Sequence, residues 1–239
     1  MAAPHTVVLV HGAWHGAWCY AALQAELDRR GVASYAVDLP GHGVSPLPLS
    51  DLYGDAQLVA DTLARIGGPV VLVGHSYGGA VIGEAATRHP DNVVHLVYLT
   101  AFCLDTGEAL LAYNATLPHA DIALGEAIRP SADGTTSTVE PALCEASFYA
   151  QCPPGTAAAA IARLCPQPFS SFLQPVTGAP WRTIPSTYVR CTLDGAIPIT
   201  SQDVMARRCA QIVTLETDHS PFASRPVETA DLLERLARA

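Results

Sequence analysis

Short, almost continuous apolar runs recur along the chain and are separated by longer amphipathic segments. The runs occupy residues 6–10, 32–37, 70–73, 93–99, 186–191 and 211–215. A strand that is covered on both faces of a sheet is apolar throughout, whereas a half-exposed strand alternates between apolar and polar residues. We therefore predict six strands, each buried on both faces.

The segments between these runs carry apolar residues at the spacing of one helix face. Four of them are predicted to be helices, at residues 18–30, 55–66, 77–89 and 226–238. Strands that alternate with helices are typical of a parallel sheet with helices on both faces. The sequence thus predicts an α/β fold with a mostly parallel sheet of about six strands.

Residues 103–180 interrupt this alternation, because no convincing buried strand can be found among their mixed glycine, proline, alanine and aromatic residues. The segment is too long for a loop of a compact domain. We interpret it as an inserted, mostly helical cap over the carboxyl ends of the strands, with residues 1–102 and 181–239 forming the core. A separate second domain is the alternative, but under about 80 residues with little apolar periodicity would form a weak core.

Charge and apolar content restrict the partners of the chain. Its 239 residues include 13 basic and 22 acidic ones, which gives a formal net charge of −9. A field of this sign repels nucleic acid and anionic lipid, and no apolar stretch reaches the roughly 18 to 20 residues that cross a bilayer. Without a signal-peptide pattern before the first run, we expect a cytoplasmic protein that binds neither nucleic acid nor membranes. The sequence leaves a homodimer open.

The seven cysteines are scattered and lack the paired spacing of a zinc site. We expect free thiols and no bound metal, with a disulfide among Cys144, Cys152 and Cys165 left open. The glycine-bearing loop at residues 11–18 has neither the dinucleotide-binding pattern nor a phosphate-loop lysine. No cofactor is therefore expected.

The pattern Gly74-His75-Ser76-Tyr77-Gly78 directly follows the third apolar run and precedes a predicted helix. A G-x-S-x-G pattern between a strand and a helix is typical of a nucleophile elbow, a sharp turn that exposes a serine hydroxyl. We therefore predict that Ser76 is a catalytic nucleophile. A purely structural glycine-rich turn is the alternative.

A serine hydroxyl needs a base to take its proton and a carboxylate to orient that base. His219 follows the last predicted strand and Asp194 follows the one before it, so both belong to loops at the sheet edge where Ser76 lies. The chain order serine, aspartate, histidine is the one expected of this arrangement. Asp105 is the alternative carboxylate, and His42, in a tight loop after the second run, is the alternative histidine.

The negative oxygen that forms when a serine attacks a carbonyl group needs two N–H donors. The backbone N–H of Tyr77, at the start of the helix after the elbow, is predicted to be one of them. The loop at residues 11–18 contains glycines that let the backbone approach, and we predict the backbone N–H of Ala13 as the second donor.

With these residues in place, the chain resembles the α/β-hydrolase superfamily over its full length. It is most similar to the branch that contains plant methylesterases, hydroxynitrile lyases and small bacterial esterases. Hydroxynitrile lyases of this branch have threonine, glutamate and lysine where this chain has Gly12, His75 and Ser220, so the resemblance favours an esterase. The similarity is carried by residues 8–18, 74–79, 168–172, 191–198 with Gln202, and 218–219.

We thus expect a cofactor-free serine hydrolase that cleaves carboxylic esters of small or aromatic-sized molecules through an acyl-enzyme. Phe102, Phe172 and Trp181 are predicted to contact the substrate in an apolar pocket. Two alternatives keep the same catalytic residues. One is a non-hydrolytic enzyme similar to hydroxynitrile lyases, and the other is a ligand receptor on the same fold.

Overall fold

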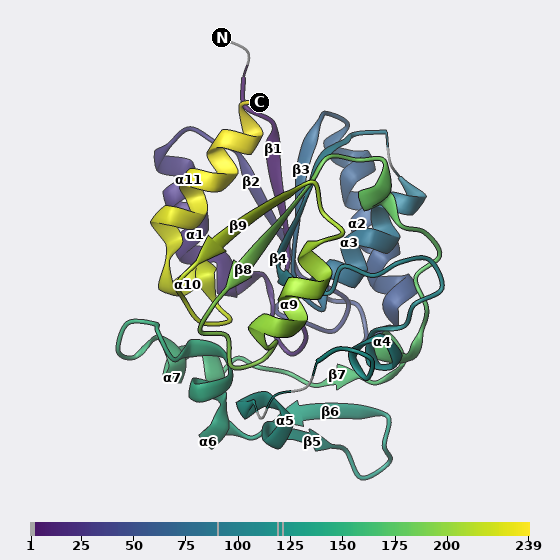
Figure 1. Ribbon diagram of the computed structural model, residues 1–239, viewed down its shortest axis with the longest axis vertical. Coiled ribbons are helices and arrows are strands. Elements are labelled where there is room, and N and C mark those ends of the chain that lie inside the picture. Colours follow the sequence, from purple (N-terminus) through teal and green to yellow (C-terminus); the bar gives the residue numbers. More distant parts are fainter. Residues whose placement is uncertain (1–2, 90, 119, 121) are drawn as a thin grey trace.

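The computed structural model describes residues 3–89, 91–118, 120 and 122–239. Six strands form one sheet in the order β2-β1-β3-β4-β8-β9, and every neighbouring pair is parallel (Figure 1). The predicted α/β fold with a parallel sheet of about six strands is confirmed. The strands are β1 (Thr6–Val10), β2 (Ser34–Val37), β3 (Val70–Ser76), β4 (Val93–Ala101), β8 (Ser186–Cys191) and β9 (Gln211–Leu215).

Helices cover both faces of the sheet. The helices of this part are η1 (Ala17–Tyr20), α1 (Ala21–Arg29), α2 (Leu52–Ile66), α3 (Gly78–Arg88), α9 (Ile199–Ala206), α10 (Pro221–Ser224) and α11 (Pro226–Ala237). Successive side chains of β1 enter two separate apolar cores: Val7 and Leu9 pack with α1 and α11, whereas Val8 and Val10 pack with α2 and α3. Figure 1 shows these two helix pairs on opposite sides of the sheet.

The edge strands and one helix of the core differ from the predicted elements. Tyr35 in β2 is 48% exposed and Ile212 in β9 is 49% exposed, because an edge strand has a neighbour on one side only. The prediction that all six strands are buried on both faces is therefore wrong for β2 and β9. In addition, α9 has no counterpart among the predicted helices, since its apolar residues do not gather on one face.

The second helix of the core begins earlier than its apolar pattern indicates. The α2 helix starts at Leu52 because the Asp51 carboxylate accepts a hydrogen bond from the Gly54 N–H and caps the first turn. It ends at Gly67, whose φ of 67° is left-handed. A polar cap at one end and a left-handed glycine at the other, neither of which carries an apolar signal, therefore set the two ends.

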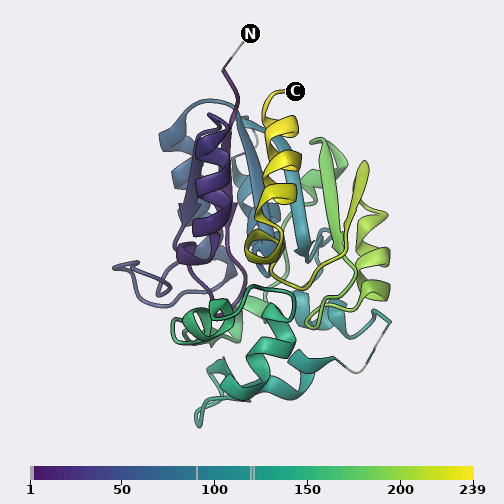
Figure 2. The same cartoon turned by 90° about the vertical axis from the view of Figure 1, so that its left-hand side faces the viewer.

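Most elements of residues 103–180 form a layer below the carboxyl ends of the strands in Figure 1, whereas the chain after residue 173 runs up beside α3 toward the start of β8. Figure 2 shows the same layer at the end of the molecule opposite the two termini. Three of the strands form a small antiparallel sheet, β5-β6-β7, which was not expected and whose two to four residues per strand are too few for a sequence pattern. The elements are α4 (Leu110–Asn114), α5 (Ala123–Ala127), β5 (Ile128–Pro130), β6 (Thr136–Val139), α6 (Pro141–Cys144), η2 (Glu145–Tyr149), α7 (Thr156–Ile161), β7 (Gln167–Pro168), α8 (Ser170–Leu173) and η3 (Pro180–Arg182).

The remaining global features concern membranes and thiols. None of the helices within the described ranges is long and apolar enough to cross a membrane. All seven cysteines carry free thiols, including Cys144, Cys152 and Cys165.

Candidate active site

Ser76 lies where β3 meets α3, at the carboxyl end of the sheet. Its φ of 53° is left-handed, a conformation that a residue with a side chain keeps only when the surrounding structure enforces it. The neighbouring His75 and Tyr77 are buried, whereas Ser76 is only half-buried. The turn therefore presents the serine hydroxyl while its flanking residues stay in the core.

Two close backbone approaches enforce this turn. A Cβ atom added at Gly74 would lie 2.3 Å from the carbonyl oxygen of Gly78, and one added at Gly12 would lie 2.8 Å from the Cβ of Ser76. Real Cβ atoms are not found at such distances from other heavy atoms. Glycine is thus required both inside the elbow and in the loop after β1, which passes directly beside Ser76.

Asp194 and His219 meet at the same edge of the sheet. Asp194 follows β8 and His219 follows β9, and His219 Nδ1 lies 2.7 Å from Asp194 Oδ2. The carboxylate also accepts hydrogen bonds from Thr100 Oγ1 at 2.5 Å and from the backbone N–H groups of Ala196 and Ile197 at 2.7 and 2.8 Å. Because an ionised carboxylate only accepts hydrogen bonds, Nδ1 of His219 donates and Nε2 is the basic nitrogen.

Ser76 and His219 are neighbours through His75. The rings of His75 and His219 have centroids 4.5 Å apart, and His75 Nε2 donates to the backbone carbonyl of His219 at 2.8 Å. Within the described part of the chain, no side-chain hydrogen bond joins Ser76 to His219. Catalytic hydrogen bonds are often long without substrate and tighten in the complex, so this pairing belongs to the proposal below.

Asp218, which precedes His219 in the chain, and the two alternative residues Asp105 and His42 have other partners. Asp218 accepts hydrogen bonds from the backbone N–H groups of Gln151 and Ser220 at 2.7 and 3.1 Å. Asp105 forms an ion pair with Arg182 on the surface. The ring nitrogens of His42 lie 2.9 Å from the Pro40 carbonyl oxygen and 3.0 Å from Gln167 Oε1. None of these three side chains is hydrogen-bonded to His219 or Ser76 among the described residues.

The loop after β1 is fixed from several sides. Trp14 has a left-handed φ of 64°, its indole N–H donates to the Ser137 carbonyl at 3.1 Å, and its own carbonyl accepts from the Cys165 N–H at 2.9 Å. His15 Nδ1 donates to the Ala13 carbonyl at 2.7 Å. These contacts hold the backbone of Ala13 against the elbow.

The side chain of Tyr77 is held away from its own backbone N–H. Its hydroxyl donates to Asp55 Oδ2 at 2.7 Å. Burial raises the pKa of Asp55 to about 7, since the charged carboxylate is poorly solvated there. The Asp55 contact thus ties the start of α3 to α2.

A cavity of about 150 Å³ adjoins Ser76. Ala13 and Tyr77 line it together with Phe102 and Phe172. Trp181 lies outside it, because its indole N–H donates to the Leu104 carbonyl at 2.8 Å and Arg182 stacks on its ring. The other lining residues are Trp14, Leu110, Leu111, Asn114, Ile122, Leu124, Gly125, Ile128, Ala196 and Ile197.

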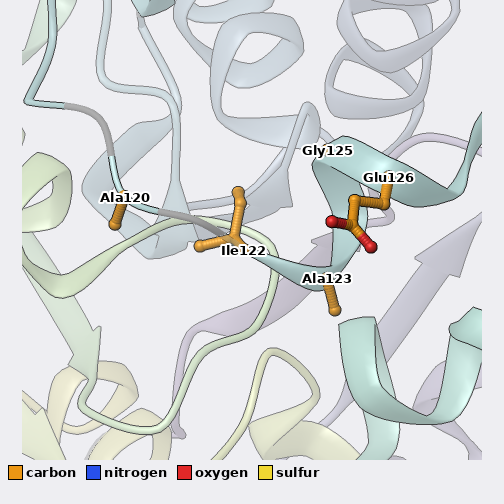
Figure 3. Close-up of a pocket in the computed structure, with 5 residues that line it drawn as sticks. All are labelled: Ala120, Ile122, Ala123, Gly125 and Glu126. Carbon is orange, nitrogen blue, oxygen red and sulfur yellow. The ribbon is translucent and has the colours of Figure 1, made fainter.

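One wall of this cavity separates it from an outer hollow. Ile122 and Gly125 line the cavity and also a surface hollow of about 380 Å³. Figure 3 shows the hollow with Ala120, Ala123 and Glu126 completing it. Ile122 and Gly125 therefore lie between the cavity beside Ser76 and the outer hollow.

Comparison with known proteins identifies the family of the chain. The model of the alpha/beta hydrolase family matches residues 7–232. The chain belongs to the alpha/beta hydrolase family. It is 30% identical to the pyrethroid hydrolase of Sphingobium wenxiniae, over 98% of this chain and 88% of that one. The pFDCC methylesterase of Arabidopsis thaliana is 29% identical, over 92% of this chain and 89% of that one.

Solved structures lead to the same branch. The crystal structure of a pyrethroid hydrolase from Sphingobium faniae JZ-2 superposes with a TM-score of 0.83 at 28% identity, and the match covers 98% of both chains. The expected membership of the α/β-hydrolase superfamily, near its methylesterases, is confirmed.

Buried histidines surround the candidate active site of this α/β hydrolase. Burial lowers the pKa of His15 to about 4 and also lowers the pKa values of His11, His42 and His75. These rings are therefore neutral at pH 7, and they act through hydrogen bonds rather than through charge.

Thr100 is a residue of this hydrolase site that the sequence patterns do not identify. It occupies the irregular step of the β3–β4 pairing, where Ser76 is paired with Ala101 and His75 with Leu99. Its φ is 38°, which is unusual for a β-branched residue. The bulge turns its hydroxyl toward Asp194, and only the folded register reveals it.

Proposed function

We propose that this α/β hydrolase is a serine carboxylesterase with Ser76 as nucleophile, His219 as general base and acid, and Asp194 as the carboxylate that orients His219. The observation that carries the proposal is the 2.7 Å Asp194–His219 hydrogen bond at the edge where the strained Ser76 turn lies. Cleavage of esters is the activity that the named esterase relatives support.

The reaction proceeds in two halves. Ser76 Oγ attacks the ester carbonyl while His219 Nε2 takes its proton, and His219 then returns the proton to the departing alcohol. A water molecule then attacks the acyl-enzyme while the same nitrogen takes its proton, and that proton passes to Ser76 Oγ as the bond to the acyl group breaks and the acid leaves. The backbone N–H groups of Ala13 and Tyr77 stabilise the negative oxygen in both halves, and each donor contributes on the order of 3 kcal/mol.

The cavity indicates the size of the group beside Ser76. Its volume is about 150 Å³ and its walls are largely apolar. An engineered apolar protein cavity of about the same volume binds benzene. We propose that one part of the substrate is a short aliphatic or single-ring group that fills this cavity. A larger group would extend past Ile122 toward the outer hollow.

The geometry disfavours the lyase alternative. Hydroxynitrile lyases resembling this chain need a threonine at the position of Gly12, where a Cβ would lie 2.8 Å from the Cβ of Ser76. They also need a lysine after the catalytic histidine, and all 13 basic residues of this chain are arginines. A departing cyanide ion would find no ammonium group beside His219.

We also propose that residues 103–180 act as a cap on a core made of residues 1–102 and 181–239. This assignment is supported by the cavity, because Leu110 and Phe172 of the segment complete the walls around Ser76 of the core. A cytoplasmic location and a homodimer stay predictions.

A panel of p-nitrophenyl esters, from acetate to decanoate and including benzoate, tests the proposal on the wild type and on Ser76→Ala. We expect short acyl esters and benzoate to be hydrolysed best, and kcat to fall by roughly 10³-fold or more in the variant. Ser170→Ala, an exposed serine in α8, serves as the control and should keep full activity. Undiminished turnover by Ser76→Ala would refute the assignment.

A further inference from the structure

A second and larger cavity lies away from Ser76. Its volume is about 480 Å³, which is within the range of about 300 to 1,000 Å³ typical of small-molecule sites. It lies between the start of α1, the α7 segment and α10, on the side of the molecule that faces the viewer in Figure 2. Its aromatic walls are Trp18, Tyr149 and Phe222.

One charged residue stands beside these apolar walls. Arg163 is exposed and lines the cavity, with its guanidinium carbon 4.8 Å from the centre of the Trp18 ring. No carboxylate among the described residues pairs with Arg163 within 4.0 Å. In a chain of net charge −9, this cavity therefore combines a large apolar surface with one unpaired positive group.

We infer that this cavity binds a small amphipathic carboxylate, with its apolar body against Trp18 and Ala159, above the buried Tyr149 and Phe222, and its carboxylate on Arg163. A guanidinium group matches a carboxylate in shape and charge. The acid released by ester hydrolysis belongs to this chemical class, and that link rests on the proposed function.

The walls of the cavity are connected to both catalytic loops. The Tyr149 hydroxyl lies 2.6 Å from His15 Nε2, and His15 Nδ1 donates to the Ala13 carbonyl at 2.7 Å. On the other side, the Phe222 ring is 4.9 Å from that of His75, which donates to the His219 carbonyl. A ligand in the cavity therefore lies over buried side chains that support the loop after β1, which holds Ala13 and is called the oxyanion loop here, and the loop after β9, which holds His219. Its binding is expected to change kcat.

Calorimetric titration with 2-naphthoate tests the site directly. The enzyme is first phosphorylated at Ser76 with diethyl p-nitrophenyl phosphate, and the added mass is confirmed, so that the catalytic cavity is blocked. We expect 2-naphthoate to bind the blocked enzyme, and 2-naphthamide, which lacks the charge, to bind more weakly. Ala159→Trp, which fills the cavity from an exposed position of α7, should abolish binding. Ala158→Trp on the same helix points outside the cavity lining and should not.

The contribution of the Arg163 charge to 2-naphthoate binding is tested by a separate pair of variants. Arg163→Gln should weaken binding of 2-naphthoate by roughly threefold to tenfold, a modest factor because the side chain is exposed, and should leave the affinity for 2-naphthamide unchanged. Arg207→Gln, which removes another exposed arginine at the end of α9, should change neither affinity. In the unblocked enzyme, 2-naphthoate should lower kcat for p-nitrophenyl acetate without a matching rise in KM, and this effect should vanish in Ala159→Trp.

Three results would overturn the inference. The first is loss of 2-naphthoate binding when Ser76 is phosphorylated, and the second is equal binding of 2-naphthoate by Ala158→Trp and Ala159→Trp. The third is purely competitive inhibition of the unblocked wild-type enzyme by 2-naphthoate. If Ser76 is not phosphorylated and no ester is cleaved, the proposed function fails instead. The comparison of Ala159→Trp with Ala158→Trp on unmodified protein then still decides whether the second cavity binds the carboxylate.

Discussion

The two halves of the candidate active site are held in place by different means. Ser76 is positioned by the backbone, through its left-handed φ of 53° and the contact of Gly74 with Gly78. His219 is positioned by side chains, through Asp194 and the His75 hydrogen bond to its carbonyl. A backbone approach of this kind leaves no room for a side chain, whereas a side-chain hydrogen bond can be weakened or replaced in steps. A substitution that crowds the Ser76 turn should therefore abolish activity in one step. Substitutions around His219 should lower activity by amounts that depend on the hydrogen bond removed.

The largest effect is expected from Gly74→Ala. The added Cβ would lie 2.3 Å from the Gly78 carbonyl oxygen, and neither backbone segment can move without displacing Ser76. We expect a loss of about 3 kcal/mol or more in the free energy of unfolding together with loss of esterase activity. The measurements are urea denaturation and hydrolysis of p-nitrophenyl acetate.

Gly83→Ala is the matched control for this substitution. Gly83 lies within α3, and the nearest atom to an added Cβ is the Tyr98 hydroxyl at 3.9 Å. Alanine should stabilise the helix there by about 0.5 to 1 kcal/mol and leave activity intact. Similar behaviour of the two variants would contradict the idea that the elbow is held by close backbone contact.

Asp194→Asn should give the next largest effect. An amide at this position presents an N–H₂ group to His219 Nδ1 and favours the tautomer in which Nε2 carries the proton, so the base is no longer available to Ser76. By analogy with other serine triads, we expect kcat to fall by roughly 10⁴-fold while the fold is retained. The measurement is steady-state kinetics at pH 7 with circular dichroism as the check on folding.

Asp218→Asn tests whether the neighbouring carboxylate has a different task. Asp218 accepts hydrogen bonds from backbone N–H groups and from Ser224 Oγ, so its replacement should cost about 1 to 3 kcal/mol of stability and less than about tenfold in kcat. If Asp218→Asn were the more damaging of the two for kcat, the assignment of Asp194 would be wrong.

This difference between the halves also explains what could be predicted from the sequence. Ser76, Tyr77 and Ala13 could be proposed as candidates because the backbone constraint around them appears in the sequence as glycines at fixed spacing. Asp194 had to compete with Asp105, because which of two loop carboxylates reaches a histidine depends on the order of the strands. The six-stranded sheet was predictable because its central strands are long and apolar.

The rest of the site depends on directions that a sequence does not contain. Thr100 faces Asp194 only because of a bulge in β4, and Trp181 faces Leu104 although its aromatic ring suggested a pocket residue. The antiparallel strands β5–β7 are too short to show alternation. In each case the decisive contact joins residues far apart in the chain.

His75 provides a graded test of the side-chain half. His75→Phe removes the hydrogen bond to the His219 carbonyl but keeps a ring of similar size, and we expect kcat to fall roughly tenfold, the equivalent of one hydrogen bond of about 1 to 1.5 kcal/mol. His75→Gln can still donate to the same carbonyl and should recover most of the loss. KM should change little in both, because His75 is buried beneath Ser76 and does not line the cavity. Equal losses in the two variants would mean that His75 acts by ring packing alone.

The smallest effect at neutral pH concerns the oxyanion loop, and it is a change in the free energy of unfolding that develops only on acidification. Both backbone conformation and a side-chain hydrogen bond hold this loop in place. Trp14 supplies a left-handed backbone there, and His15 supplies a side-chain hydrogen bond to Ala13. Burial lowers the pKa of His15 to about 4, whereas an unfolded histidine has a pKa of about 6.5. Between these values the unfolded chain binds the proton more readily, so the free energy of unfolding falls as the pH is lowered from about 6.5 toward 4.

The contribution of His15 to this loss should be about 2 kcal/mol between pH 7 and pH 5. The His15→Gln variant cannot take up that proton. Its free energy of unfolding should therefore fall by about 2 kcal/mol less between pH 7 and pH 5 than that of the wild type. Urea denaturation of both proteins at pH 7 and pH 5 measures the difference. Equal losses in both proteins would show that folding does not lower the pKa of His15, and would contradict the prediction that its surroundings keep the ring neutral.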